Sequence, residues 1–295
     1  MAGAPFAWRN PMNLKSLRDI PPWDWPENAA GLILETLEDS TAKASQKLLA
    51  ADLAGEISVM NDEIANALIQ IVSEQSQPEE LRASAAISLG PGLEEADIHG
   101  FDDDVDIALS EKTVHSIQRS LRKIYFEASV PKEVRRRVLE ASVHFPEGWH
   151  KGALRGICAS DDEEWRLTSM FCMRYIKGFE SWILEALESK NPDIQYEAVR
   201  AAGEWELKSA WPRIAALLGT PETDKDLILA AIDAAAVLCP DKASELLDEL
   251  ADSKDEDIAE AALDALLEMD HEASWDEDGE DFDEDEEEDD EEDPR

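Results

Sequence analysis

Apolar residues recur at helical spacing along most of the chain, and the pattern repeats. Three segments, which begin at Asp193, Asp226 and Asp257, place an aliphatic residue directly after the Asp and an Ala five positions after it, followed by a second aliphatic residue. The three Asp residues stand 33 and 31 positions apart, and Glu133 and Glu164 extend the series toward the N-terminus. A period of roughly 30 residues is typical of stacked helix pairs, so the pattern predicts helical repeats over residues 29–269.

A second set of apolar positions indicates the partner helix of each repeat. Pairs of Leu or Ile at i, i+3 spacing recur between the Asp-led segments: Leu184 and Leu187, Ile214 and Leu217, Leu247 and Leu250. Helix-capping sequences stand at the joints, among them Asn191-Pro192 and the capping boxes Ser160–Glu163 and Ser253–Glu256. Each repeat is therefore expected to consist of two helices joined by a short connection.

Alanine dominates the repeated positions at which neighbouring layers would meet. The two sets that correspond to each other are Ala198, Ala201 and Ala202, and Ala231, Ala234 and Ala235. Because helices approach closely only where side chains are short, we expect these alanines to form the contacts between layers, while Leu217 and Leu250 fill the space within pairs. No layer buries its apolar face alone, so each depends on its neighbours.

Three stretches depart from the repeat. Residues 1–28 include the sequence PPWDWP, and because proline restricts helix formation we expect an extended arm whose Trp rings pack on the first helix or dock on a partner. Residues 91–112, with Gly and acidic clusters, exceed the repeat length and are expected to form a protruding loop. Residues 270–295 hold 18 Asp or Glu and are expected to be a disordered acidic tail.

The segment Leu81-Arg-Ala-Ser-Ala-Ala-Ile-Ser-Leu-Gly90 resembles the V-R-x-x-A-A-x-A-L-G helix of HEAT repeats, and the short period is similar to that of the HEAT-like repeats of phycobilisome lyases. The resemblance implies an all-α fold, a right-handed α-solenoid of about six to seven helix pairs. It also implies a ladder of hydrogen bonds between repeats, made by Arg82, Arg135 and Arg166. Gln195, Ile228 and Ala259 replace Arg in the later repeats, so the ladder should fade there. HEAT repeats serve unrelated functions, so the resemblance names no activity.

The chain is strongly acidic, since 69 Asp and Glu against 27 Lys and Arg give a formal net charge of −42. Phosphate binding needs a basic footprint, so nucleic acid and anionic membranes are disfavoured as partners, and a basic protein partner is favoured. The sequence shows no membrane span or secretory signal, and Cys158, Cys172 and Cys239 have neither disulfide nor zinc spacing. We therefore expect a soluble cytoplasmic monomer. Adaptation to high salt is a further explanation for the charge.

Candidates for catalysis or metal binding are few. Asp102, Asp103, Asp104 and Asp106 resemble the start of a calcium loop, but Ile107 stands where such a loop needs Gly and Thr113 where it needs Glu. The chain has five histidines, and no two of them have i, i+3 or i, i+4 spacing: His99, His115, His144, His150 and His271. The turn between His144 and His150 is typical of exposed or loosely packed rings. Cys172 lies in an apolar run and is expected to be buried. No nucleophile elbow, phosphate loop or dinucleotide fingerprint appears, so we predict no catalytic residue, metal or cofactor.

Two groups of side chains are candidates for binding. Four tryptophans within the repeats are expected to pack in the core rather than to form a ligand cage: Trp165, Trp182, Trp205 and Trp211. Seven basic residues also gather in one stretch: Arg119, Arg122, Lys123, Lys132, Arg135, Arg136 and Arg137. These form either a solvated helix edge or a patch that binds an anion or a partner, for which Arg is well suited.

Two classes of function fit these observations. The first, which the sequence favours, is a non-enzymatic scaffold that binds a protein partner through the surface of the solenoid, with the acidic tail modulating the binding. The second is an enzyme or enzyme subunit, because HEAT-like proteins include bilin lyase subunits and alkylated-base DNA glycosylases. A glycosylase needs a basic face for the duplex, so the acidity disfavours it more than it disfavours a lyase.

Overall fold

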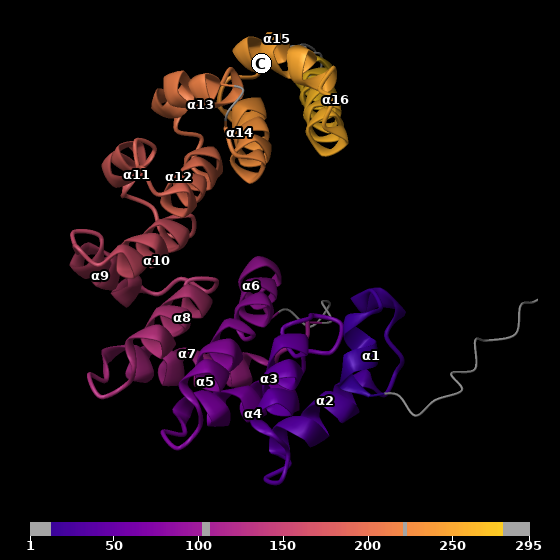
Figure 1. Ribbon diagram of the computed structural model, residues 1–295, viewed down its shortest axis with the longest axis vertical. Coiled ribbons are helices and arrows are strands. Elements are labelled where there is room, and N and C mark those ends of the chain that lie inside the picture. Colours follow the sequence, from indigo (N-terminus) through magenta and orange to yellow (C-terminus); the bar gives the residue numbers. More distant parts are fainter. Residues whose placement is uncertain (1–12, 102–106, 221–222, 280–295) are drawn as a thin grey trace, which may run out of the picture. The chain divides into compact units, whose positions relative to one another are not determined.

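The computed structural model describes residues 13–101, 107–220 and 223–279, with side chains as far as His271 (Figure 1). Over these residues every regular element is a helix and no strand occurs, which confirms the predicted all-α fold. The chain divides into two compact units, Met1–Ile176 and Lys177–Arg295. The two units are therefore described one after the other. The aspartates of the calcium-like sequence, Asp102–Asp104 and Asp106, lie outside the described residues.

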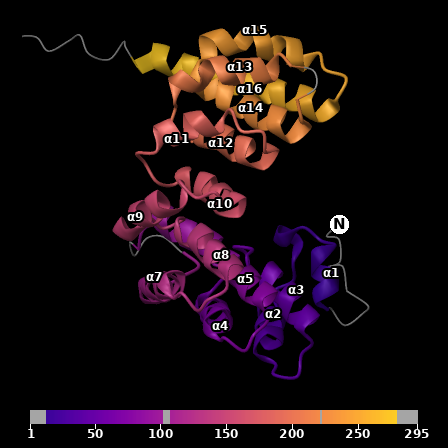
Figure 2. The ribbon, with the colours of Figure 1, turned by 60° about the vertical axis from the view of Figure 1, so that its left-hand side comes forward.

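The first unit is a stack of helix pairs, visible in Figures 1 and 2. The pairs are α2 with α3, α4 with α5, α7 with α8, and α9 with α10, and α3, α5, α8 and α10 pack on one another in that order. The elements are α1 (Leu14–Arg18), the 3₁₀ helix η1 (Pro22–Asp24), α2 (Ala29–Glu38), α3 (Ala44–Leu53), α4 (Asp62–Ser73), α5 (Glu79–Ile87), α6 (Gly90–His99), α7 (Glu111–Phe126), α8 (Lys132–Ser142), α9 (Gly148–Ile157) and α10 (Glu163–Met173). The predicted repeats thus extend through this unit.

The N-terminal stretch is more structured than the prolines suggested. Residues 14–18, which we expected to be extended, form α1, because Asn13 accepts hydrogen bonds from the amides of Lys15 and Ser16 and the prolines of the PPWDWP sequence come after the helix. The indole of Trp25 folds back and donates to the carbonyls of Leu17 and Ile20, both at 3.0 Å. Trp25 thus packs on the helix inside the N-terminal stretch itself, whereas the expected packing on the first repeat helix stays a prediction. The first twelve residues lie outside the described part of the chain.

Residues 91–112 interrupt the repeat, as expected, but the first part of this insertion is a helix rather than a loop. Helix α6 begins at Gly90 and carries Pro91 in its first turn, where a missing amide hydrogen costs little. Leu93 and Ala96 are buried, and α6 packs on α7 and α8. At Gly92 an added Cβ would lie 2.9 Å from a methyl carbon of Leu109, so the close approach requires glycine. Burial on neighbouring helices thus outweighs the low helix propensity of this segment.

The second unit contains the Asp-led segments found in the sequence. Its elements are α11 (Glu180–Ala186), α12 (Pro192–Glu204), η2 (Lys208–Ala210), α13 (Trp211–Leu218), α14 (Lys225–Leu238), α15 (Pro240–Ala251) and α16 (Glu256–Gly279). Helices α12, α14 and α16 are the second helices of three pairs, and α14 packs against both of the others. These are the helices that begin near Asp193, Asp226 and Asp257, so the predicted repeat and its period are confirmed.

Small residues make the contact between layers, as the sequence predicted. All six alanines of the two corresponding sets are at most 3% exposed. A Cβ added at Gly203 of α12 would lie 3.3 Å from the Cα of Ala234 in α14, so the two helices approach almost backbone to backbone. On α16, Leu263 occupies the repeat position of the fully buried Val199 and Ile232, yet it is half exposed. Helix α16 is the last described layer, which leaves that position uncovered.

Two further expectations change in detail. The capping residues of α10 and α16 are Asp162 and Asp255, each two positions after the serine that we expected to cap the helix. Helix α16 runs to Gly279, so residues 270–279, which we assigned to the acidic tail, are helical here. Residues 280–295 lie outside the described residues. The four tryptophans of the repeats are half-buried rather than fully enclosed.

Candidate interaction surfaces

The seven basic residues predicted as one patch lie on two helices and have different surroundings. Arg119, Arg122 and Lys123 are exposed on α7. The others belong to α8: Lys132, Arg135, Arg136 and Arg137. The two groups are treated in turn, because a cation that is already paired with a carboxylate attracts an external anion far less than a solvated one does.

Arg136 and Arg137 belong to a buried polar network that joins α8 to α10. Arg136 Nε donates to Thr168 Oγ1 at 2.9 Å, and that hydroxyl donates to Glu140 Oε1 at 2.6 Å. Arg137 Nη1 donates to the other oxygen of Glu140 at 2.7 Å, and both arginines donate to Glu133 at 2.8 Å. Arg136 and Glu140 are no more than 5% exposed and Thr168 is fully buried.

This network is balanced in charge, with two guanidinium groups against the carboxylates of Glu133 and Glu140. A buried ion pair adds little net stability, because desolvation offsets the attraction, but it penalises any arrangement that separates the partners. We therefore interpret the network as a device that sets the register of α10 on α8. Both carboxylates stand at i, i+3 or i, i+4 spacing from the arginines, so the sequence contained the signal.

The hydrogen-bond ladder implied by the HEAT resemblance runs in a different direction from the one expected. Arg82 Nε donates to the carbonyl of Val72, and Arg135 Nε to that of Tyr125, at 2.9 and 2.8 Å. Each bond connects the two helices of one pair, not two repeats. In the later repeats Gln195 takes over the role, since its amide donates to the carbonyl of Leu187 at 2.7 Å.

Lysines at the starts of helices make ion pairs between repeats. Lys132, at the start of α8, contacts Asp162 at 3.0 Å and also Glu164 at the start of α10. Lys225, at the start of α14, contacts Asp255 at 2.7 Å and also Asp257 at the start of α16. Hydrogen bonds to these two carboxylates raise the pKa of Lys225 to about 12. The same clamp thus occurs in both units at equivalent repeat positions.

Aromatic rings gather beside Arg135, where α7 ends and α8 begins. The guanidinium carbon of Arg135 lies 5.5 Å from the ring centre of Tyr125 and 5.7 Å from that of Trp165. Phe126 meets Tyr125 at 5.0 Å and Trp149 at 5.4 Å, both edge to face. Tyr125 is buried, whereas Phe126 is 57% exposed. The cluster therefore shows part of its aromatic area to solvent.

An acidic ridge runs along the exposed faces of α12, α14 and α16 in the second unit. Each helix carries its ridge residues at spacings of i, i+3, i+7 and i+11 from the leading Asp, which places them on one side of the helix. The twelve residues are Asp193, Tyr196, Arg200 and Glu204 on α12, Asp226, Leu229, Asp233 and Val237 on α14, and Asp257, Glu260, Asp264 and Glu268 on α16. Eight are Asp or Glu and one is basic, so the ridge is a strongly negative surface.

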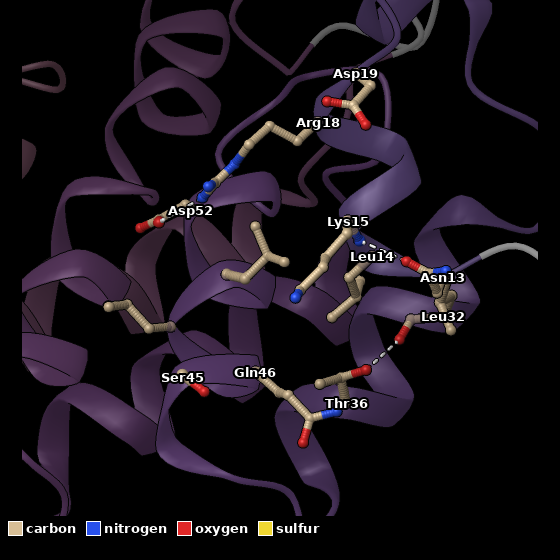
Figure 3. Close-up of a pocket in the computed structure, with 12 residues that line it drawn as sticks. Asn13, Leu14, Lys15, Arg18, Asp19, Leu32, Thr36, Ser45, Gln46 and Asp52 are labelled. Carbon is tan, nitrogen blue, oxygen red and sulfur yellow. Dashed lines mark hydrogen bonds and ion pairs between the residues drawn. The ribbon is translucent and has the colours of Figure 1, made fainter.

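A cleft of about 890 Å³ lies between α1, α2 and α3 of the first unit (Figure 3). Leu14, Leu32 and two leucines of α3 line it together with polar and charged side chains. Arg18 reaches across toward Asp52, with 3.9 Å between the charged atoms, and both side chains are largely exposed. The cleft combines apolar contacts with compensated charges.

Two histidines are packed more tightly than the turn between them suggested. His150 is fully buried at the start of α9, with Nδ1 2.8 Å from the amide of Glu147 and Nε2 2.9 Å from the hydroxyl of Ser142. Burial lowers its pKa to about 4. His144 is half-buried, and its Nδ1 lies 3.2 Å from Glu94 of α6. Burial lowers the pKa of His144, while the Glu94 carboxylate opposes the shift.

Within the described residues no three potential metal ligands gather in one place. Cys172 is buried, as the sequence predicted. None of the helices in the described part of the chain is both long enough and apolar enough to cross a membrane.

Comparison with known proteins agrees with the repeat geometry of the second unit. Residues 180–267, which span α11 to the middle of α16, match the family described as HEAT repeats. This segment is a HEAT-repeat array. The acidic ridge is therefore the exposed face of the second helices of three HEAT repeats. The closer similarity to the phycobilisome-lyase type stays a prediction, and no curated protein matches the sequence.

Several solved structures are similar to the chain at low identity. Human deoxyhypusine hydroxylase in complex with glycerol is 17% identical, with 88% of both chains covered and a TM-score of 0.40. The YibA protein of Escherichia coli is 18% identical, with 86% of this chain and 85% of that chain covered and a TM-score of 0.45. A computationally designed armadillo repeat protein for modular peptide recognition is 16% identical, with 80% of this chain and 98% of that chain covered and a TM-score of 0.30. Similarity at this level says nothing of a shared function.

Sequence reasoning missed the acidic ridge of the HEAT array, although its signal was present. The leading Asp of each repeat was recognised as a marker of the period. The residues three, seven and eleven positions after it follow the same period, and these positions form the ridge. The aromatic cluster was missed for a different reason, since Phe126, Trp149 and Trp165 come from three helices that only the fold brings together.

Proposed function

We propose that this chain is a non-enzymatic HEAT-repeat scaffold that binds a basic segment of a protein partner along the acidic ridge. One observation carries the proposal: the three stacked helices α12, α14 and α16 carry eight carboxylates, of which Asp257 is paired with Lys225, and a single Arg on their aligned faces. Like charges at this density repel one another and lower the stability of the fold. A surface of this kind is explained when a partner of opposite charge neutralises it.

The ridge also offers apolar contacts, which a binding site needs in addition to charge. Tyr196 of α12, Leu229 of α14 and Val237 of α14 stand between the carboxylates, and Val237 is 51% exposed. Complementary charge mainly raises the association rate and excludes wrong partners, whereas desolvated apolar and aromatic side chains supply much of the affinity. A segment that alternates Lys or Arg with apolar residues matches this arrangement.

The acidic tail fits the same function. We propose that residues 270–295, with their 18 carboxylates, increase the encounter rate with the basic partner by extending the negative field around the molecule. This effect is long-ranged and should therefore fall as salt shortens the screening length, to about 8 Å at physiological ionic strength.

The test reverses three ridge charges and compares them with three reversals elsewhere in the same array. The variant Glu204→Lys, Asp264→Lys, Glu268→Lys alters the ridge. The control Glu245→Lys, Asp248→Lys, Glu249→Lys alters exposed residues of α15 and changes the net charge equally. Binding of a labelled peptide of alternating Arg and Leu is measured by fluorescence anisotropy at several salt concentrations.

We expect the ridge variant to bind the peptide at least about tenfold more weakly than the wild type, because three charge contacts become repulsive. The control should stay within about twofold of the wild type. Equal weakening of both variants would mean that the peptide responds to bulk charge, and the ridge would then not be the binding surface.

A further inference from the structure

The exposed face of α7 in the first unit has a charge opposite to that of most of the surface. His115, Arg119, Arg122 and Phe126 stand at spacings of i, i+4, i+7 and i+11, so they share one side of the helix, and Lys123 stands beside them. All five are exposed, while the opposite side of α7 packs on α4, α6 and α8. Figure 2 shows α7 beside α4 and α8. We call these five residues the α7 stripe.

The cations of the α7 stripe are not used to hold the fold together. Within the described residues no carboxylate lies within ion-pair distance of Arg119, Arg122 or Lys123, and Arg119 Nε donates to the carbonyl of His115 on its own helix at 3.1 Å. Neighbouring cations at i, i+3 and i, i+4 cost a helix about 0.2–0.5 kcal/mol for each pair. On α8, by contrast, Lys132, Arg136 and Arg137 are each matched by carboxylates.

The stripe ends in the aromatic cluster. Phe126, its last residue, is 57% exposed and packs edge to face on Tyr125 and Trp149. Its ring is therefore held in place by buried and half-buried neighbours rather than free to rotate into solvent. A fixed aromatic ring next to Arg side chains is the composition of binding hot spots in protein interfaces.

We infer that the α7 stripe binds an acidic segment of a protein partner that carries an aromatic or large apolar side chain beside its carboxylates. The carboxylates would pair with Arg119, Arg122 and Lys123, and the apolar side chain would pack on Phe126 and Trp149. The occupant is a short acidic peptide because the stripe covers only one helix face. Nucleic acid and anionic membranes need a wider basic footprint, which a chain of net charge −42 does not provide. The site is independent of the acidic ridge, so the failure of either proposal leaves the other standing.

The experiment uses the full chain and a labelled acidic peptide of about fourteen Asp and Glu residues with one central Phe, a length comparable to that of α7 when helical. A second peptide replaces the Phe by Ala. The protein variants are Arg119→Glu with Arg122→Glu, and Phe126→Ala. The charge-matched control is Lys190→Glu with Lys242→Glu, two exposed lysines of the second unit. Fluorescence anisotropy gives the affinity of each combination, and circular dichroism checks that every variant melts like the wild type.

We expect the double Arg variant and Phe126→Ala each to bind the Phe peptide at least about tenfold more weakly than the wild type, and the control to stay within about twofold. Replacing the Phe of the peptide should weaken binding to the wild type but have little effect on binding to Phe126→Ala, because the two rings then no longer interact. The inference is overturned if the wild type shows no saturable binding, or if the control weakens binding as much as the double Arg variant. It is also overturned if duplex DNA or anionic lipid vesicles bind more tightly than the peptide and lose that binding in the Arg variant.

Discussion

The buried imidazole of His150 gives the first unit a stability that depends on pH. The ring is fully buried, and burial lowers its pKa from 6.5 to about 4 in the folded state. Because the folded pKa lies below the unfolded one, the neutral ring favours folding above pH 6.5, and this contribution is lost as the pH falls toward 4. Each unit of pKa difference corresponds to about 1.4 kcal/mol, so the full loss is about 3 kcal/mol, and about 2 kcal/mol is lost between pH 7.5 and pH 5.

The substitution His150→Asn removes the titrating group while leaving an amide oxygen that can accept the hydrogen bond from the Glu147 amide. The variant loses packing on Trp149, so its absolute stability falls at every pH. The informative quantity is the change in unfolding free energy between pH 7.5 and pH 5, measured by denaturant titration. We expect the wild type to lose about 2 kcal/mol more than the variant over this range. The exposed His99→Asn serves as the control and should follow the wild type.

Other groups titrate over the same range. Acidification relieves negative charge in all three proteins alike, so the comparison between them removes this shared effect on the unfolding free energy. A proton NMR titration of the His150 ring in the wild type measures the same quantity directly and does not depend on the variant folding. Parallel stability profiles for the wild type and His150→Asn, or a measured pKa near 6.5, would refute the assignment of a buried neutral ring.

Two further predictions concern packing between layers. Thr168→Val keeps the shape of the side chain but removes the hydroxyl that links Arg136 to Glu140, and should lower the unfolding free energy of the first unit by about 1–3 kcal/mol, whereas Ser129→Ala at an exposed turn should change it little. An unchanged melting curve for Thr168→Val would show that the network does not depend on this hydroxyl. Gly203→Val forces side-chain atoms into the 3.3 Å contact with Ala234 and should destabilise the second unit by about 1–3 kcal/mol in thermal melts. Gly219→Val is the control, because a Cβ there makes only an ordinary contact at 3.5 Å and should not destabilise the unit by overpacking. Equal effects of the two glycine substitutions would argue against a close contact between α12 and α14.

The repeat was predictable because its signal is local and periodic. Asp193, Asp226 and Asp257 mark the starts of helices that the structure places in successive layers, and the alanines five residues later are buried as expected. Helix α6 was not predictable from composition, because Gly90, Pro91 and Gly92 disfavour a helix and only the surfaces of α7 and α8 make one stable there. Local propensity is a weak guide where tertiary burial decides.

The binding surfaces were predictable only in part, for a similar reason. The count of basic residues between Arg119 and Arg137 was visible in the sequence, and so were Glu133 and Glu140, the local partners of Arg136 and Arg137, but the partners that lie in the next repeat were not. Thr168 and Glu164, which contact Arg136 and Lys132, come from the next repeat, about 30 residues further along the chain. Charges that are neutralised across layers therefore look free in the sequence, and only the stacking shows that Arg119, Arg122 and Lys123 are the ones left to solvent.

The close contact of α12 and α14 separates the positions of a repeat into two classes with different freedom to diverge. Gly203 and Ala234 leave no space for a larger side chain, so mutations there are selected against by folding alone. The outward positions of the same helices already hold Asp, Arg, Tyr, Leu and Val in corresponding columns. Specificity can therefore be rewritten at the outward positions without rebuilding the scaffold, which makes this array a natural starting point for libraries of engineered binders.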